Sequence, residues 1–232
     1  MTMSTETAAC ATYDFYAPIH KGLRAASTQL LVRIGATDFA DPAATAALLG
    51  ALRRQLALAA AHLEHEDRHI HAALEARAPG ASGTLESQHD DHRAGFAELA
   101  GLIAGIEAAG PAARPALGHR LYLAYSRFVA EDFEHMAEEE TVVLPELQRL
   151  FSDAELMAIE GAILAEIEPP EMMEYMRLML PAMNRTERAG LLGLMRQGAP
   201  PEAFAAVLDH AARPLLPPEE WRDLAARLDL AA

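Results

Sequence analysis

The sequence predicts an all-α protein, an up-down-up-down four-helix bundle with additional short C-terminal helices. Composition favours this class, because the β-branched residues Val and Ile supply only 5 and 8 of the 232 residues. Apolar residues recur at three- and four-residue steps in four long stretches, which is the spacing of one helical face. Glycine and proline separate these stretches, so we expect short loops between antiparallel neighbours. The expected helices span about 15–35, 42–78, 84–109 and 115–151.

The first two helices are expected to meet at a short turn. Gly35 ends the first helix, whose apolar face includes His20. Asp41-Pro42 has the order of an N-cap followed by proline at the first helical position, which predicts the start of the second helix. The apolar stripe of the second helix includes His62 and Glu66, so polar groups are expected inside the bundle.

The third and fourth helices repeat this mixture of apolar and metal-ligating residue types. His89 and His92 share the apolar face of the third helix, and His135 and Glu139 share that of the fourth. Pro145 lies inside the fourth helix and cannot donate a backbone hydrogen bond, so we expect a kink there.

The C-terminal part of the chain differs in composition. Ser152-Asp153 is expected to cap a short fifth helix, after which residues 169–232 carry 8 of the 14 prolines. We expect three or four short helices there, packed on the bundle or on a partner, and a division into 13–168 and 169–232. His210 stands alone and Trp221 is interpreted as a packing anchor, so no site is expected in this part.

Charge and cysteine content limit the partners and the compartment. The formal net charge is −15, which disfavours nucleic acid and anionic membrane surfaces as partners. The single cysteine, Cys10, allows no internal disulfide and fits a reducing compartment. The N-terminal residues lack the basic and apolar segments of a secretory signal, and no apolar stretch is long enough to cross a bilayer. A cytoplasmic location is expected.

One spacing of a histidine and a glutamate occurs twice and supplies residue types that bind metal ions. The segments HLEHEDRHIHA, from His62, and HMAEEETVVLP, from His135, both contain H-x-x-x-E, and the second resembles a weak repeat of the first. A further histidine precedes each motif, 42 residues before His62 and 46 before His135. The six candidate metal ligands are His20, His62, Glu66, His89, His135 and Glu139.

This spacing favours a metal site with two ions. Residues at i and i+4 lie about one turn apart on the same helical face, so each motif directs an imidazole and a carboxylate to the bundle axis. Imidazole suits iron, copper and zinc, and a carboxylate bridges two ions with its two oxygens. Divalent cations would also keep two buried carboxylates ionised, and a bridging hydroxide would reduce the remaining positive charge.

The order of these motifs resembles the hemerythrin-like, or HHE cation-binding, family. The resemblance rests on YAPIHKGLR, HLEHEDRHIHAALE and HMAEEETVVLPEL and covers about residues 13–165. It implies a four-helix bundle with a non-haem di-iron centre, in which the six candidate ligands hold two iron ions bridged by carboxylates and by an oxo or hydroxo group. It also implies binding or sensing of oxygen, nitric oxide or redox state.

The sequence departs from the oxygen-carrying members of this family. Their extra histidine on the third helix would stand at Arg93, with His92 one residue away. The last acidic ligand also has two candidates, Glu139 and Glu140. Whether His92, His69 or Glu140 also coordinates metal is left open. The departure favours a more open site than that of an oxygen carrier.

Several other polar residues have a structural and a functional interpretation. His65 and His71 fall off the ligand face and are expected in solvent, whereas His69 lies near it. Asp132, one turn before His135, is either an exposed charge or a carboxylate that orients an imidazole. The tyrosines Tyr13, Tyr16 and Tyr125 are expected to pack in the core rather than serve the site.

Three further classes of function remain open at this stage. They are a di-iron peroxidase or oxidase, a scaffold whose metal is only structural or an iron-storage module, and a zinc hydrolase. The last rests on His65-Glu66-x-x-His69, which has the H-E-x-x-H zinc signature but leaves His20, His62 and the second motif without roles. A metal-binding or sensor protein is favoured over an enzyme. Its expected ligand is a small diatomic molecule or peroxide, and the C-terminal helices are expected to bind a second copy or another protein.

Overall fold

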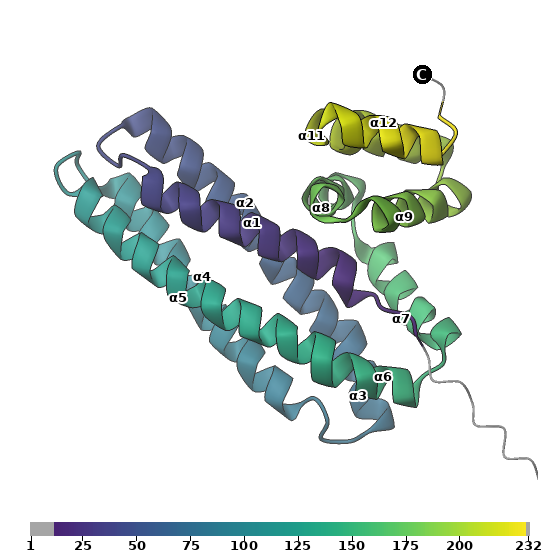
Figure 1. The fold of residues 1–232 in the computed structure, drawn as a ribbon. Helices are drawn as coiled ribbons and strands as arrows, with labels where there is room; N and C mark the ends of the chain where they lie inside the picture. Colours follow the sequence, from purple (N-terminus) through teal and green to yellow (C-terminus); the bar gives the residue numbers. More distant parts are fainter. Residues whose placement is uncertain (1–11, 231–232) are drawn as a thin grey trace, which may run out of the picture.

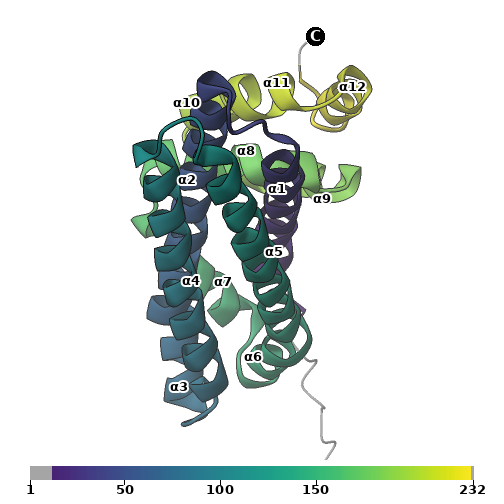
Figure 2. The same cartoon turned by 90° about the vertical axis from the view of Figure 1, so that its left-hand side faces the viewer.

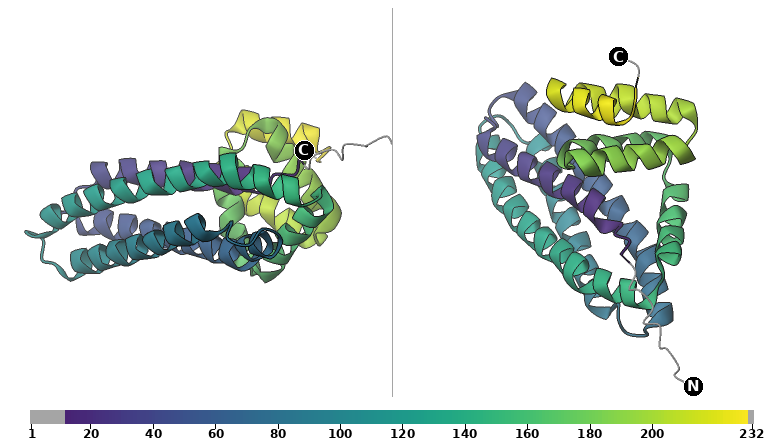
Figure 3. Two further views of the ribbon diagram at one scale, coloured as in Figure 1. Left: turned by 90° about the horizontal axis from the view of Figure 1, so that it is seen from below. Right: turned by 45° about the vertical axis from the view of Figure 1, so that its right-hand side comes forward.

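The structure is a computed structural model that describes residues 12–230, which are helical and contain no strand. Cys10 lies outside the described residues. The long helices of the chain lie side by side in an elongated bundle (Figure 1). They are α1 (Tyr16–Ala36), α2 (Pro42–His65), α4 (Gly83–Ala108) and α5 (Arg114–Glu138). Consecutive helices are joined by short loops and α5 also packs on α1, as the view from below shows (Figure 3). The predicted all-α class is confirmed.

Both helices that carry H-x-x-x-E continue through a π-helical turn. From α2 the chain passes through η1 (Glu66–His71) into α3 (Ala72–Arg77), and from α5 through η2 (Glu139–Val143) into α6 (Leu144–Leu150). The irregularity expected at Pro145 therefore lies just before it, in η2. Proline is not the shared cause, because η1 is followed by Ala72. Each π turn begins at the glutamate of the motif, and such turns are frequent at functional sites.

Two helix starts were predicted from their capping residues, and both are confirmed. The Asp41 side chain accepts hydrogen bonds from the backbone N–H groups of Ala43 and Ala44, and Pro42 follows as the first helical residue. Ser152 begins α7 (Asp153–Glu166) with a capping box, in which Ser152 and Glu155 each bond the backbone of the other. These caps satisfy N–H groups that a helix leaves without an internal partner.

The bundle has an apolar cluster at each end and buried polar residues between them. The cluster nearer the α1–α2 loop includes Ile34, Leu52 and Ile106, and the cluster at the other end includes Leu74 and Leu147. The buried histidines and glutamates between them are His20, Glu66, His71, His89, His92, His135 and Glu139. Because buried charges are costly without a partner, this middle layer marks the place to search for a site.

The C-terminal helices form a second small layer with its own apolar core (Figure 2). They are α8 (Pro169–Ala182), α9 (Arg185–Gly198), α10 (Pro201–Val207), η3 (Leu208–Ala212), α11 (Arg213–Leu215) and α12 (Pro218–Arg227). The division expected at 168/169 falls between α7 and α8. Helix α8 packs across α1, and the Tyr175 hydroxyl donates a hydrogen bond to the Leu58 carbonyl of α2 at 3.0 Å. This layer therefore rests on the first two helices of the bundle.

Among the described helices, none combines the length and the apolar character needed to cross a membrane.

Gly118 in α5 allows the ring of Phe39 to pack close to the helix backbone. A Cβ on Gly118 would lie 2.2 Å from Cδ2 of the buried Phe39 ring, so Gly118→Ala is expected to destabilise the fold by about 1–3 kcal/mol. Gly101→Ala on α4 is the matched control, because its Cβ meets open space and is expected to stabilise by about 0.5–1 kcal/mol. Urea unfolding followed by circular dichroism measures both, and equal midpoints would contradict the packing argument.

Candidate metal centre

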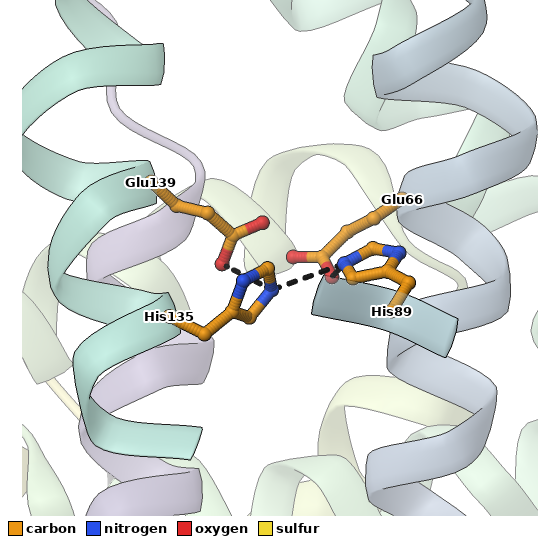
Figure 4. Close-up of side chains that lie close together, drawn as sticks. All are labelled: Glu66, His89, His135 and Glu139. Carbon is orange, nitrogen blue, oxygen red and sulfur yellow. Dashed lines mark hydrogen bonds and ion pairs between the residues drawn. The ribbon is translucent and has the colours of Figure 1, made fainter. Parts of the chain in front are cut away.

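The six predicted ligands come from all four long helices and meet in the polar middle layer. His20 lies on α1, His89 on α4, and each of the other two helices contributes one H-x-x-x-E pair. Glu66 and Glu139 are the first residues of η1 and η2. Figure 4 shows Glu139 and His135 on one side facing Glu66 and His89 on the other. His20, His89 and Glu139 have no exposed surface, whereas the side chain of His62 is 16% exposed, so the centre is largely enclosed.

The two carboxylates lie between two pairs of histidines. On one side, Glu66 Oε1 is 3.0 Å from His62 Nε2 and 3.7 Å from His20 Nε2. On the other side, Glu66 Oε2 is 3.8 Å from His89 Nε2. Glu139 Oε2 is 3.4 Å from His20 Nε2 and 3.5 Å from His135 Nε2, so this carboxylate also touches both pairs. The arrangement yields two sets of ligand atoms that share Glu66, namely Glu66 with His89, His135 and Glu139, and Glu66 with His20 and His62.

Several of the ligand atoms lack hydrogen-bond partners, although they are buried. This is true of Nε2 of His20 and His62, Oε1 of Glu66 and both carboxylate oxygens of Glu139. Buried polar groups are otherwise nearly always hydrogen-bonded, and leaving one unpaired costs about 1–3 kcal/mol. Cations coordinated by these atoms would remove that cost. The residues present therefore fit a metal centre.

The pKa values of the two buried carboxyl groups shift in opposite directions. Burial raises the pKa of Glu66, but the adjacent His62 and His20 outweigh it and hold the pKa well below its usual value. Burial and the neighbouring Glu66 raise the pKa of Glu139 well above its usual value. Burial lowers the pKa of His135 to about 3, which keeps this imidazole neutral and able to ligate. Cations would allow Glu139 to ionise as well.

Comparison with known proteins identifies the family. The hemerythrin HHE cation binding domain matches residues 12–147, which is more than half of the chain. The chain belongs to the hemerythrin HHE cation-binding family. The matched residues contain all six ligands predicted from the motifs, and the protein is accordingly cation-binding. No curated protein and no solved structure matches the chain.

In this hemerythrin-like centre, three histidines have a hydrogen-bond partner at Nδ1, the ring nitrogen that does not face the centre. His89 Nδ1 lies 2.7 Å from Asp67 Oδ1, and His20 Nδ1 lies 3.0 Å from Glu140 Oε1. The Nδ1 of His135 lies 2.7 Å from Oε1 of Gln88. A hydrogen bond donated from Nδ1 leaves the lone pair on Nε2, which is the nitrogen that faces the centre. These partners therefore select the tautomer that a metal ion requires.

Two of these partners follow directly after the glutamate ligands. Asp67 comes after Glu66 and Glu140 comes after Glu139, so each motif reads H-x-x-x-E followed by an acid. Each second acid holds a histidine on a different helix. The sequence prediction treated Glu140 as a rival ligand and missed Asp67 and Gln88. The repeated acidic pair was the available signal for Asp67, whereas nothing in the spacing indicated Gln88.

The prediction for His71 is wrong. It was expected in solvent, but it is buried, its ring stacks on His89 at 4.7 Å between centroids, and its Nδ1 lies 3.0 Å from Asp67 Oδ1. The π turn explains the difference. Hydrogen bonds in η1 join residues five apart rather than four, which rotates His71 toward the face of Glu66.

The remaining polar candidates lie around the centre. His69 pairs with Glu166 at 3.2 Å, and Arg93 forms ion pairs with Asp67 and Asp90. Among the described residues, the groups able to hold a metal include neither His65 nor His69, so H-E-x-x-H finds no support as a zinc site. Asp132 faces His92 instead of His135, with 3.7 Å between Oδ1 and Nε2.

The three tyrosines differ in their contacts. Tyr16 packs its ring on His20 at 4.9 Å, and its buried hydroxyl has no hydrogen-bond partner. Tyr125 belongs to the apolar cluster nearer the α1–α2 loop, and Tyr13 donates a hydrogen bond to Glu160. Core packing is the role of Tyr125, as expected, and Tyr16 alone borders the ligands.

Proposed function

We propose that this chain is a non-haem di-iron protein that binds or senses oxygen, nitric oxide or redox state. The observation that carries the proposal is the position of Glu66 and Glu139, each within 4 Å of histidines from both pairs. Two carboxylates that lie near both histidine pairs suit a centre with two neighbouring metal ions. Four imidazoles with two carboxylates are ligands that iron accepts. When bound, two irons supply one-electron redox chemistry and coordination positions for a small molecule.

The protein contributes a largely buried and pre-arranged set of donors. Asp67, Gln88 and Glu140 hold three imidazole rings in place, so little reorganisation is needed when metal binds. The pKa of Glu140 is lowered to about 2 by its hydrogen bonds with His20 and Arg24, so it is ionised at neutral pH and supports a proton on His20 Nδ1.

A sensing role is supported by the position of the C-terminal layer. Helix α8 packs on α1, the helix that carries His20, and Lys21, the next residue, forms an ion pair with Glu187 on α9. A small shift of α1 that follows a change in the metal centre would therefore reach α8 and α9 directly. The same layer is our proposed docking place for a second copy or another protein.

The test is the metal content and optical spectrum of anaerobically purified protein before and after exposure to air. Two irons per chain, with new near-ultraviolet absorption in air, are the expected result. One zinc per chain and an unchanged spectrum would overturn the redox function. Steady consumption of peroxide with a reductant would instead favour the peroxidase alternative, and uptake of many irons per chain would favour storage.

Asp67→Asn tests the support behind His89. The asparagine would hold Nδ1 less strongly, and we expect metal affinity to fall by about 10–100-fold while the number of bound ions stays the same. Asp90→Asn is the matched control, because Asp90 shares the partner Arg93 but does not contact His89. Competition with a chelator of known affinity measures both variants. Equal affinities for the two would show that Asp67 does not support the centre.

A further inference from the structure

A groove between α4 and α5 reaches the wall of the metal centre from outside. Its volume is about 500 Å³, and its lining runs from Gln88 to Leu99 on α4 and from Ala124 to His135 on α5. His92 and His135 line this groove and also a small inner cavity, whose other walls include Glu66 and Glu139. These two histidines therefore lie between the groove and the inner cavity, and His135 is itself one of the six candidate ligands.

The mouth of the groove is strongly acidic. It is lined by Asp91, Glu98, Glu131 and Glu134, with Arg127 as the only basic residue, and Arg127 is paired with Glu98 at 2.6 Å. Within the described part of the chain, the other three acids have no basic partner within ion-pair distance. Such a mouth attracts cations, repels anions and leaves neutral molecules unaffected.

His92 has an unused nitrogen at the inner end of the groove. Its Nδ1 donates a hydrogen bond to the Gln88 carbonyl at 2.8 Å, and because a carbonyl only accepts, the lone pair of the neutral ring is on Nε2. The side chain is 6% exposed, and Nε2 is buried with no hydrogen-bond partner. Oδ1 of Asp132 lies 3.7 Å from this nitrogen, and Asp132 lines the inner cavity. Neither residue belongs to the two sets of ligand atoms.

We propose that the α4–α5 groove is the route by which divalent cations enter the centre, and that His92 and Asp132 form a transit site at its inner end. The proposal rests on the proposed metal-binding function. Acids at the mouth raise the local concentration of cations. His92 Nε2 and the Asp132 carboxylate then replace part of the hydration shell before the cation reaches Glu66 and Glu139, since imidazole and carboxylate are common ligands of divalent transition metals.

Uptake kinetics on the full chain test the route. Metal-stripped protein, checked by circular dichroism for retained helix, is mixed with Co²⁺ in a stopped-flow spectrometer. Glu131→Gln combined with Glu134→Gln removes two mouth charges. Glu64→Gln combined with Glu202→Gln makes the same charge change at exposed positions outside the groove. We expect the mouth variant alone to load about tenfold more slowly at low salt, with the same final stoichiometry. The difference in uptake rate between the mouth variant and the control pair should disappear as the salt concentration rises from about 0.01 M to about 1 M, because salt screens the mouth charges.

His92→Leu tests the transit site separately, because leucine keeps an apolar side chain of similar size but has no ligand atom. Slower uptake with unchanged final stoichiometry is expected. Equal rates for the mouth variant, the control pair and His92→Leu, with native stoichiometry in each, would overturn the entry route and leave the metal centre standing. Absence of bound metal in the unmodified chain would overturn the proposed function, and the route with it.

Discussion

Replacing Glu66 with glutamine is expected to abolish stable binding of both metal ions. The two oxygens of Glu66 face different histidine pairs, with Oε1 near His62 and Oε2 near His89. Glutamine offers one neutral oxygen, and its amide group would direct N–H donors at the position of a cation. Because both sites share this carboxylate, the loss should exceed that caused by removing one histidine.

The measurement is metal content per chain after dialysis, with circular dichroism to verify the fold. Glu64→Gln is the matched control, because it changes the same residue type on the same helix at an exposed position. His62→Ala is expected to lose only the ion on the His20 side. Two ions retained by Glu66→Gln would show that this carboxylate is not shared between the sites.

Replacing Arg188 with alanine is expected to destabilise the C-terminal layer by about 3–5 kcal/mol, because it removes one partner of a buried, hydrogen-bonded charge. Arg188 is 2% exposed, and its guanidinium donates to the carbonyls of Leu180 and Met183, each at 2.8 Å. A further nitrogen lies 2.8 Å from Glu220 Oε2, which ties α9 to α12. Alanine would leave two carbonyls and a carboxylate without this donor and a cavity among apolar residues.

Trp221, the single tryptophan, lies on α12 in this layer, so its fluorescence during urea unfolding reports on the change. Arg222→Ala is the control, because Arg222 is exposed and bonds only within its own helix, to the Pro218 carbonyl. Its expected effect is within about 0.5 kcal/mol. A common unfolding midpoint for the two variants would refute the role assigned to Arg188.

Local patterns in the sequence were sufficient to predict the architecture. Helical spacing, the Asp41-Pro42 and Ser152 caps, and the glycines and prolines between helices predicted an all-α chain with four long helices. These features act over a few residues, so they are visible without knowledge of the packing. The paired H-x-x-x-E motifs depend on the same α-helical period, and the structure brings all six candidate ligands together.

The positions of the side chains that follow the π turns could be determined only from the structure. Spacing based on 3.6 residues per turn holds as far as Glu66 and Glu139, and beyond them the changed register moves His71 inward. The partners of the imidazoles were also out of reach, since Asp67 and Glu140 act on histidines 22 and 120 residues away in the chain. Such contacts, like the groove that ends at His92, depend on how the helices pack side by side. That packing results from the apolar clusters of the whole chain, so it cannot be predicted from the spacing of residues within one segment.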